Sequence, residues 1–376
     1  MKMKAAVLTA CGLPRPFAKS KPIHVLEVDL EPPGEGEVLV KVGGAGLCHS
    51  DLSLLNGDRP RPVPMVLGHE GAGEIVEVGA GVHDVKKGDH VCFTFNVSCG
   101  RCRRCLEGRP YICERSVTPR AAGQLLSGKH RLSYQGKPVN HQSGVSCYAE
   151  YAVVDRGSVV VIDKTLPLDL AALFGCAVVT GVGAVVNTAQ IEAGSSVAIV
   201  GLGGVGLSGL LGAVLAGASR IVAIDLADDK LGLARQLGAT DTVSAKDADH
   251  VKQVRDLTNG GVDYAFDLAG TIKSMETAYL VTRWGGTTVS AGLSPLGANF
   301  SFQQSVLVSE EKTIKGSYMG SCVPVRDIPR FIALYQQGKL PVDRMVSKRV
   351  GFDELNEGFD RLQDVATVRQ ILVPHG

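Results

Sequence analysis

Four cysteines stand close together at a spacing typical of metal-binding loops. Cys99, Cys102, Cys105 and Cys113 form the pattern C-x2-C-x2-C-x7-C. The glycine and arginines between them allow one short loop to fold around an ion, and four thiolates leave no open coordination position. Thiols scattered by chance, disulfides and an iron–sulfur cluster are the alternatives. The clustering favours a structural zinc site.

A glycine-rich string in the second half of the chain has the chemistry of a phosphate-binding turn. It follows the apolar run SVAIV, opens a helical segment and contains Gly201, Gly203, Gly204, Val205 and Gly206. In such a G-x-G-x-x-G turn the glycines permit a tight bend, a close approach of pyrophosphate and helix–strand packing. Asp225 ends the next predicted strand, where a carboxylate binds the ribose hydroxyls and repels the extra phosphate of NADP. The alternative is a helix-capping aspartate in an unrelated α/β protein. The string predicts an NAD site.

Three further candidate metal ligands are dispersed along the chain. Cys48 lies in GLCHSD, His69 in LGHEG and Cys176 in LFGCAVVTG. Each one alone is interpreted more simply as a buried thiol or a core histidine. Their spacing does not unite them into a site.

The elements expected around these residues divide the chain into two parts. Short alternating runs such as 37–42 and 73–79, bounded by glycine and proline turns, predict a compact β-rich domain. From about residue 178, strands alternate with helices, which predicts a doubly wound parallel sheet of the Rossmann type. An amphipathic helix at 328–337 and a mixed tail then return to the first domain. We expect an α/β fold with a first domain of residues 1–177 and 321–376 and a cofactor domain of residues 178–320.

Composition restricts the class of partner. The chain has 39 Lys and Arg against 38 Asp and Glu, so no global field favours nucleic acid or an anionic membrane. The apolar stretch 201–217 is interrupted by glycines and is shorter than the roughly 20 residues of a membrane span. Cysteines spaced for a metal suit a reducing compartment better than disulfides would. We therefore expect a cytoplasmic protein with a small-molecule partner.

Four segments occur in the order seen in zinc-dependent medium-chain alcohol dehydrogenases, and the chain resembles that family nearly end to end. They are GHEGAGEIVEVGAGV, the four-cysteine loop, GCxxxTGxGA and GLGGVG. The resemblance implies a GroES-like catalytic domain with two zinc sites and a Rossmann domain that binds NAD. The implied reaction moves hydride between an alcohol and NAD, or back to an aldehyde or ketone.

The resemblance also implies a role for each site residue. Cys48, His69 and Cys176 would hold a catalytic zinc whose fourth position is open to water or substrate. Glu70 matches the family's nearby glutamate, and Asp51 matches the carboxylate that orients the zinc-bound histidine. The remaining matches are Ser50, which takes the substrate proton, and the cofactor contacts Thr180, Lys230, His49 and Arg369.

The proton path is expected to differ from that of liver-type enzymes. Ser53 stands where those enzymes have a histidine. A hydroxyl passes a proton on but does not hold one near neutral pH, whereas an imidazole does. The relay from Ser50 is therefore expected to end in water, with His49 as the competing base.

Other departures concern the oligomer and the substrate. The segment 116–141 resembles a loop retained by dimeric members, which favours a homodimer. Ser116 replaces the arginine with which glutathione-dependent formaldehyde dehydrogenases bind the glutathione carboxylate, although Arg115 beside it keeps that activity as the alternative. An alternative of another class is a metal-free binding relative, but such branches typically lack these cysteines.

The side chains expected around the substrate do not identify it. Phe95 matches an aromatic wall of the family's pocket. Gln142 and Ser143 stand where liver-type enzymes have apolar residues, which predicts a more polar pocket. Primary alcohols, including benzylic and allylic ones, are the expected substrates. A hydrophobic pocket gains only about 1 to 3 kcal/mol from a methylene group, so the lining residues do not select among these alcohols.

Overall fold

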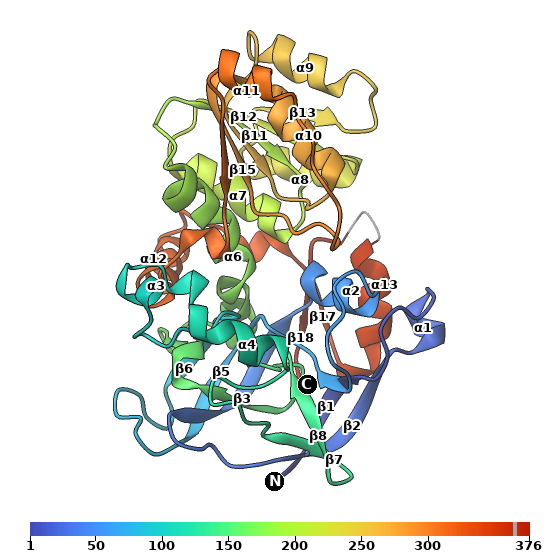
Figure 1. The fold of residues 1–376 in the computed structure, drawn as a ribbon, viewed down its shortest axis with the longest axis vertical. Helices are drawn as coiled ribbons and strands as arrows, with labels where there is room; N and C mark the ends of the chain where they lie inside the picture. The colour runs from blue at the N-terminus through green and yellow to red at the C-terminus, as the bar shows by residue number, and fades with distance from the viewer. Residues whose placement is uncertain (364–366) are drawn as a thin grey trace. The chain divides into compact units, whose positions relative to one another are not determined.

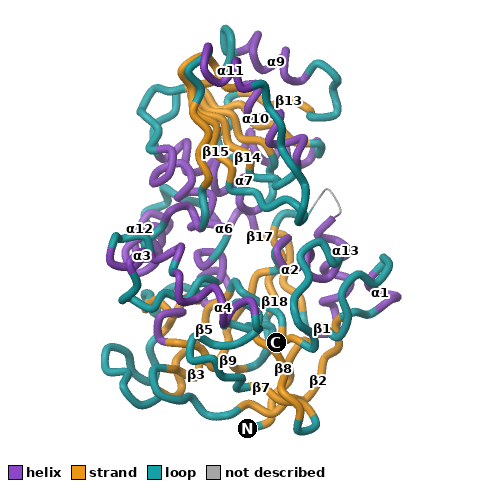
Figure 2. Tube along the Cα trace, in the orientation of Figure 1, coloured by secondary structure: helices purple, strands orange, loops and turns teal. Residues whose placement is uncertain are grey.

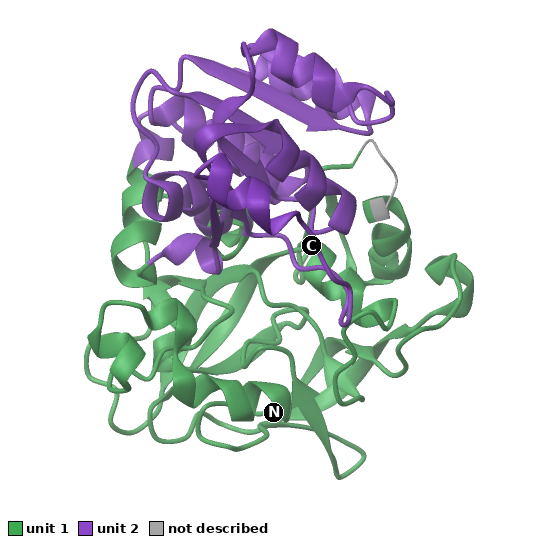
Figure 3. Ribbon diagram, turned by 45° about the horizontal axis from the view of Figure 1, so that its top comes forward, with its two compact units in different colours: residues 1–176, 323–333, 346–376 green, residues 177–322, 334–345 purple. Residues whose placement is uncertain are grey.

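The structure is a computed structural model that describes residues 1–363 and 367–376. The chain forms two compact units (Figure 3): unit 1 comprises residues 1–176, 323–333 and 346–376, and unit 2 residues 177–322 and 334–345. We predicted the segment 334–345 in the first domain. It belongs to unit 2 because the 3₁₀ turn Val342–Met345 packs on a helix of that unit, with Met345 Sδ 3.9 Å from Ser208 Oγ.

Unit 1 is rich in strands, as predicted (Figure 2). A closed barrel contains β1 (Lys2–Leu8), β2 (Ile23–Leu30), β7 (Leu132–Tyr134), β8 (Lys137–His141) and β4 (Met65–Val66). A second sheet contains, in order, β10 (Val159–Val161), β6 (His90–Phe93), β5 (Gly71–Val78), β3 (Glu37–Gly46), β18 (Arg369–Leu372) and β17 (Val346–Val350), with β9 (Tyr151–Asp155) also paired to β3. Its helices are α1 (Phe17–Ser20), α2 (His49–Leu55), α3 (Arg103–Leu106), α4 (Val117–Ala121), α5 (Leu168–Ala171) and α13 (Leu355–Gln363).

Strand β3 separates two apolar cores. Val38, Val40 and Val42 are buried in one cluster, whereas Leu39 is buried in the other. Successive side chains of a strand point to opposite faces, so the apolar run of β3 supplies both cores. This double burial fixes the register of β3 against its neighbours.

The register of β3 positions two of the expected metal ligands and one expected cofactor contact. The end of β3 pairs with the start of β5, Ala45 opposite Gly71, and with β18, Ile371 opposite Gly46. Both pairings are antiparallel, so the residues after β3, those before β5 and those that start β18 meet at one edge of the sheet. Cys48, His69 and Arg369 stand at these three positions.

The segment 116–141, predicted as a loop, contains regular structure. It begins with α4 and then forms the hairpin of β7 and β8. Strand β7 pairs with β2 and β8 pairs with β4, so the hairpin closes the barrel. The strands have only three and five residues, too few to show a clear alternating pattern in the sequence.

Unit 2 has the predicted doubly wound parallel sheet (Figure 1). Its strand order is β13 (Asp241–Ser244), β12 (Arg220–Asp225), β11 (Ser196–Val200), β14 (Val262–Asp267), β15 (Thr282–Ser290) and β16 (Thr313–Gly316). The helices are α6 (Ala177–Gly183), α7 (Gly204–Leu215), α8 (Asp228–Gln236), α9 (His250–Leu257), α10 (Ile272–Val281) and α11 (Gln304–Ser309). The order reverses at β11 and β14, where a doubly wound sheet binds its ligand at the carboxyl ends of the strands.

One helix boundary differs from the sequence-based expectation. α12 (Pro324–Gln336) begins four residues before Ile328, where the amphipathic helix was expected to start. A proline is tolerated in the first helical turn, which explains the earlier start of α12.

Within residues 1–363 and 367–376, no single helix has both the length and the apolar character of a membrane span. One bent pair, Leu168–Gly175 with Ala177–Ala189, meets these criteria by length and composition alone.

Candidate metal and dinucleotide sites

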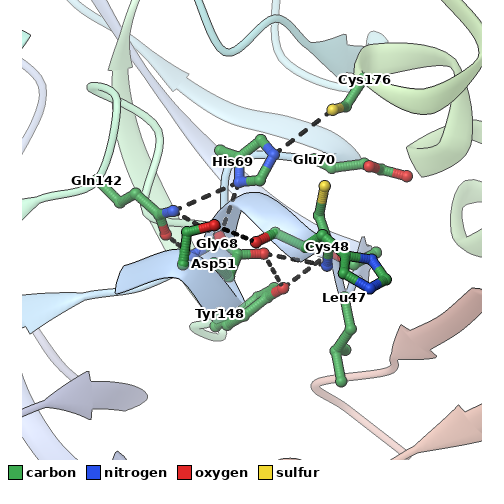
Figure 4. A network of polar contacts seen from close by, with 12 residues as sticks. Leu47, Cys48, Asp51, Gly68, His69, Glu70, Gln142, Tyr148 and Cys176 are labelled. Carbon is green, nitrogen blue, oxygen red and sulfur yellow. Dashed lines mark hydrogen bonds and ion pairs between the residues drawn. The ribbon is translucent and has the colours of Figure 1, made fainter. Parts of the chain in front are cut away.

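Four buried side chains of unit 1 place their ligand atoms together. Cys48, His69, Glu70 and Cys176 each offer one such atom, all within 4.8 Å of one another. The Cys176 thiol lies 3.5 Å from His69 Nε2 and points toward the ring (Figure 4). The structure thus places Cys48, His69 and Cys176 in one site, which their spacing in the sequence could not show, and adds the Glu70 carboxylate to it.

The His69 ring is oriented by a buried carboxylate. Asp51 lies in the first turn of α2, which Cys48 caps, and its Oδ1 accepts a hydrogen bond from His69 Nδ1 at 2.8 Å. Because a carboxylate only accepts, Nδ1 carries a proton, and Nε2, which faces Cys176, is the nitrogen left to ligate a metal. This is the arrangement in which a histidine ligates a metal while a carboxylate holds its other nitrogen.

Glu70 is paired with a buried arginine. Arg369 Nη2 lies 3.3 Å from Glu70 Oε2, and Arg369 Nη1 donates to the Leu47 carbonyl oxygen at 3.0 Å. Both Glu70 oxygens are buried, and neither has a hydrogen-bond partner. A Cβ at Gly46 would lie 2.6 Å from Glu70 Oε1, so only glycine leaves room for this carboxylate.

The electrostatics of this cluster suit a cation. A hydrogen bond from the Cys176 thiol holds the pKa of Cys48 well below its usual value, and His69 lowers it further. Burial raises the pKa of Glu70 to about 7, although Arg369 opposes the change. Several acidic groups thus share a largely buried space, where an unneutralised charge is costly. A divalent ion that binds thiolate and imidazole groups fits this donor set.

The four-cysteine loop forms a second cluster within unit 1. Cys99, Cys102, Cys105 and Cys113 offer sulfur atoms within 4.8 Å of one another. Cys102 Sγ lies 3.5 Å from Cys105 Sγ and 3.9 Å from Cys113 Sγ, whereas four thiolates around one zinc stand about 3.8 Å apart. No disulfide joins any of the ten cysteines, all of which lie in the described part of the chain. The donor set fits a closed zinc site.

The glycine-rich turn of unit 2 has the predicted strand–turn–helix context. It connects β11 to α7, and Gly201 has a φ of +90°. A Cβ at Gly206 would collide with the Gly201 carbonyl oxygen, so glycine is required for the turn to close on the helix. Asp225 accepts hydrogen bonds from the Leu202 amide at 2.6 Å and the Ala227 amide at 3.0 Å, which hold its carboxylate beside the turn.

Other predicted cofactor and proton-relay residues are placed as follows. His49 and Ser50 are exposed on the first turn of α2, and Ser53 Oγ donates to the His49 carbonyl oxygen at 2.9 Å. In unit 2, Lys230 is half-buried in α8, and the buried Thr180 hydroxyl has no hydrogen-bond partner.

The substrate-side residues require one correction. The Phe95 ring stands edge-on to His69, with centroids 5.7 Å apart, where an aromatic wall was expected. Gln142 was expected to make the pocket more polar. Its side chain is instead buried, and both of its amide atoms are hydrogen-bonded within the protein. Gln142 therefore offers a substrate no polar group.

No pattern in the sequence indicates a role for Tyr148. Its hydroxyl lies 2.7 Å from Asp51 Oδ2, inside the same network. Tyr148 and Gln142 are far from Asp51 in the chain and belong to no spacing motif, so only the three-dimensional structure reveals this contact.

Comparisons with known proteins agree with this architecture. Residues 34–164 match the alcohol dehydrogenase GroES-like domain, and residues 204–337 match the zinc-binding dehydrogenase domain. The chain is 36% identical to S-(hydroxymethyl)glutathione dehydrogenase from Paracoccus denitrificans, covering 99% of this chain and 100% of the relative.

Two solved structures extend the comparison. Benzyl alcohol dehydrogenase from Acinetobacter calcoaceticus superposes with a TM-score of 0.92 at 33% identity, covering 100% of this chain and 99% of the other. A zinc-binding dehydrogenase from Sinorhizobium meliloti 1021, bound to NADP, has a TM-score of 0.82 at 30% identity, covering 100% of both chains.

The fold and the two cysteine-containing clusters thus define an oxidoreductase built from a GroES-like and a Rossmann domain. The chain belongs to the zinc-dependent medium-chain alcohol dehydrogenase family.

Proposed function

We propose that this enzyme transfers hydride from a primary alcohol with an aromatic or allylic skeleton to NAD, and reduces the aldehyde in reverse. The buried cluster of Cys48, His69, Glu70 and Cys176 is the observation that supports this proposal most directly. In it, Cys48, His69 and Cys176 would hold a zinc ion. When bound, zinc supplies the Lewis-acid polarisation of an alcohol or carbonyl oxygen.

The chain's own residues would position the ligands and move the proton. Asp51 holds the His69 ring so that Nε2 faces Cys176. Arg369 forms an ion pair with Glu70, so the positive charge of Arg369 is partly neutralised within the protein and is not wholly available to pyrophosphate. Ser50 would accept the substrate proton and pass its own on toward water, because Ser53, whose hydroxyl donates to the His49 carbonyl oxygen, does not hold a proton near neutral pH as an imidazole does.

We further propose that the four-cysteine cluster holds a second, structural zinc. The four cysteines would supply all four ligands of a tetrahedral ion, so no coordination position is left for a substrate. This ion would stabilise the loop that runs from Cys99 to Cys113.

The preference for NAD is proposed from Asp225. Its carboxylate is fixed beside the glycine-rich turn, where it would repel a ribose phosphate. In the Asp225→Ser enzyme we expect the ratio of kcat/KM for NADP to that for NAD to rise about tenfold or more, since a like-charge contact costs several kcal/mol. Steady-state kinetics with both cofactors measure this ratio.

Asp228→Ser is the matched control for that variant, because Asp228 is exposed in the first turn of α8, three residues away. The control should keep the wild-type ratio. An unchanged ratio in Asp225→Ser would show that this carboxylate does not choose the cofactor.

The aromatic substrate class is supported by two features. The Phe95 ring stands beside His69, and the amide of Gln142 is fully engaged within the protein. The similar Acinetobacter enzyme is named for benzyl alcohol. A panel of benzyl, allyl and straight-chain primary alcohols and S-(hydroxymethyl)glutathione, assayed with NAD and with zinc analysis, tests the proposal.

We expect two zinc ions per chain and the highest kcat/KM with benzyl or allyl alcohol. A folded preparation with no zinc and no turnover would support the metal-free binding protein instead.

S-(hydroxymethyl)glutathione is the second candidate substrate because a relative at 36% identity is named for it. Ser116, where an arginine was expected for that substrate, is buried and donates to the Cys113 carbonyl oxygen at 2.8 Å. Arg115 is exposed beside it. A kcat/KM for this hemithioacetal above that for every simple alcohol would favour this alternative.

We also propose a homodimer in a reducing, cytoplasmic setting. Strand β16 ends the sheet of unit 2 and pairs on one side with β15. Trp284 and Val308 are exposed apolar side chains of that unit. An edge strand together with exposed apolar residues suits association with a second copy. The absence of disulfides among the ten cysteines is consistent with a reducing compartment.

A further inference from the structure

The Gln142 side chain connects the two segments that carry Asp51 and His69. Its Oε1 accepts from the Gly68 backbone amide at 2.5 Å, and its Nε2 donates to Asp51 Oδ1 at 2.5 Å. The orientation of the amide is unambiguous, because a backbone N–H only donates and a carboxylate only accepts. Gly68 directly precedes His69, so one side chain holds both partners of the Asp51–His69 pair (Figure 4).

Tyr148 holds the second oxygen of the same carboxylate. Its hydroxyl lies 2.7 Å from Asp51 Oδ2 and 2.8 Å from the Gly46 carbonyl oxygen. The hydroxyl has one proton, and the bond to the charged acceptor is the stronger of the two. Donation to Asp51 is therefore favoured.

These contacts complete the surroundings of Asp51. Oδ1 accepts from His69 Nδ1 and Gln142 Nε2, and Oδ2 accepts from Tyr148 Oη and the Cys48 amide. Four donors occupy the roughly four acceptor positions of one carboxylate. Such a carboxylate has no freedom to rotate away from His69.

The backbone around Gln142 is itself fixed. The Gln142 backbone N–H donates to Ser146 Oγ at 2.9 Å, and the Ser146 hydroxyl donates to the Val66 carbonyl oxygen at 2.8 Å. Gly68 has a φ of +97°, and a Cβ there would lie 2.5 Å from the Tyr148 backbone nitrogen. The barrel thus holds Gln142, Gly68 and Tyr148 in one arrangement.

We propose that Gln142 and Tyr148 are positioning residues for the catalytic metal: they lock Asp51 against His69 Nδ1 and thereby fix the direction of His69 Nε2. This inference rests on the proposed function. Neither residue is among the four whose ligand atoms cluster. Tyr148 acts through Asp51, and Gln142 acts through Asp51 and through the Gly68 amide that precedes His69. It also explains why a glutamine is buried at a position where liver-type enzymes have an apolar residue.

The test measures zinc retention, with the four-cysteine site of the same chain as an internal reference. Gln142→Met replaces the amide by an apolar chain of similar length, and Tyr148→Phe removes only the hydroxyl. Each purified, zinc-loaded variant is exposed to a chromogenic chelator, and the release of its two ions is followed in time. The Cys176→Ala enzyme, which lacks a ligand of one site, identifies which release phase belongs to that site.

We expect one ion to be released about 10 to 100 times faster from each variant than from wild type. Removing a residue that supports a metal ligand through hydrogen bonds typically lowers the metal affinity by such a factor. The second ion should leave at the wild-type rate. The kcat for alcohol oxidation should fall by a similar factor while the KM for NAD is unchanged. In the double variant the effects should be less than multiplicative, since both residues act through Asp51.

Tyr279→Phe is the matched control, because Tyr279 is also buried but its hydroxyl has no hydrogen-bond partner. It should release both ions at the wild-type rates. If wild type holds two zinc ions and oxidises alcohols, yet both variants release them normally, the positioning role is overturned and the proposed function stands. Equal acceleration of both ions would indicate general unfolding and also overturn it. A zinc-free wild type would overturn both proposals.

Discussion

The Cys176→Ala enzyme is expected to lose alcohol oxidation by about 10³-fold or more and to bind NAD as wild type does. The physical reason is the loss of one of three proposed protein ligands, since Lewis-acid polarisation contributes several kcal/mol and about 1.4 kcal/mol is a factor of ten in rate. The glycine-rich turn and Asp225 belong to unit 2 and are not altered. Stopped-flow kinetics with an alcohol, and NAD titration by calorimetry, measure the two properties separately.

Cys92→Ala is the control for this variant. Cys92 is equally buried, but its thiol lies 3.3 Å from the Ala171 carbonyl oxygen and belongs to neither metal cluster. Burial raises the pKa of Cys92 well above the usual value, so this sulfur stays a thiol rather than becoming a ligand. Its replacement should leave turnover within about twofold of wild type. Activity in Cys176→Ala that also remains within twofold would exclude the proposed catalytic site.

The two local motifs could be predicted from the sequence because their chemistry is contained in short segments. The four cysteines lie within one loop, and the glycine-rich turn is flanked by the strand and the helix that identify it as a dinucleotide-binding turn. Spacing along the chain is then nearly equivalent to proximity in space. The strand order of unit 2 follows from the same kind of local pattern, since alternating strands and helices with right-handed crossovers leave few topologies.

The catalytic cluster could not be predicted from spacing. Cys48 and His69 meet because Ala45 pairs with Gly71 across β3 and β5, a register set by burial on both faces of β3. Only family resemblance could propose that triplet from the sequence. The same limit explains Gln142, which family position alone assigned to the pocket.

The short elements could not be predicted from the sequence either. The hairpin of β7 and β8 has strands too short for a clear period, and it acquires its partners only when the barrel closes on β2 and β4. Likewise, the segment 334–345 follows a helix that begins in unit 1. Its assignment depends on packing against α7 rather than on any feature of its own sequence.

The Cys102→Ala variant is expected to melt about 10 °C below wild type and to contain one zinc ion per chain. A closed zinc site contributes its binding free energy to folding, and losing several kcal/mol shifts the melting temperature of a domain of this size by about 2 to 4 °C per kcal/mol. Cys102 is central to the cluster, since its sulfur lies nearest to those of Cys105 and Cys113 and its amide donates to Cys99 Sγ at 3.3 Å. Calorimetric melting and metal analysis on the same sample measure both quantities.

Cys11→Ala provides the comparison, because Cys11 is half-buried and outside both metal clusters. It should hold two zinc ions and melt within about 2 °C of wild type, as expected for a change of up to about 0.5 kcal/mol. The Cys102→Ala enzyme that remains folded at low temperature should still oxidise alcohol at a rate near wild type, since Cys48, His69 and Cys176 are untouched. Normal melting together with two bound zinc ions would show that the four cysteines hold no structural metal. Loss of turnover in fully folded protein would instead mean that this cluster takes part in the reaction.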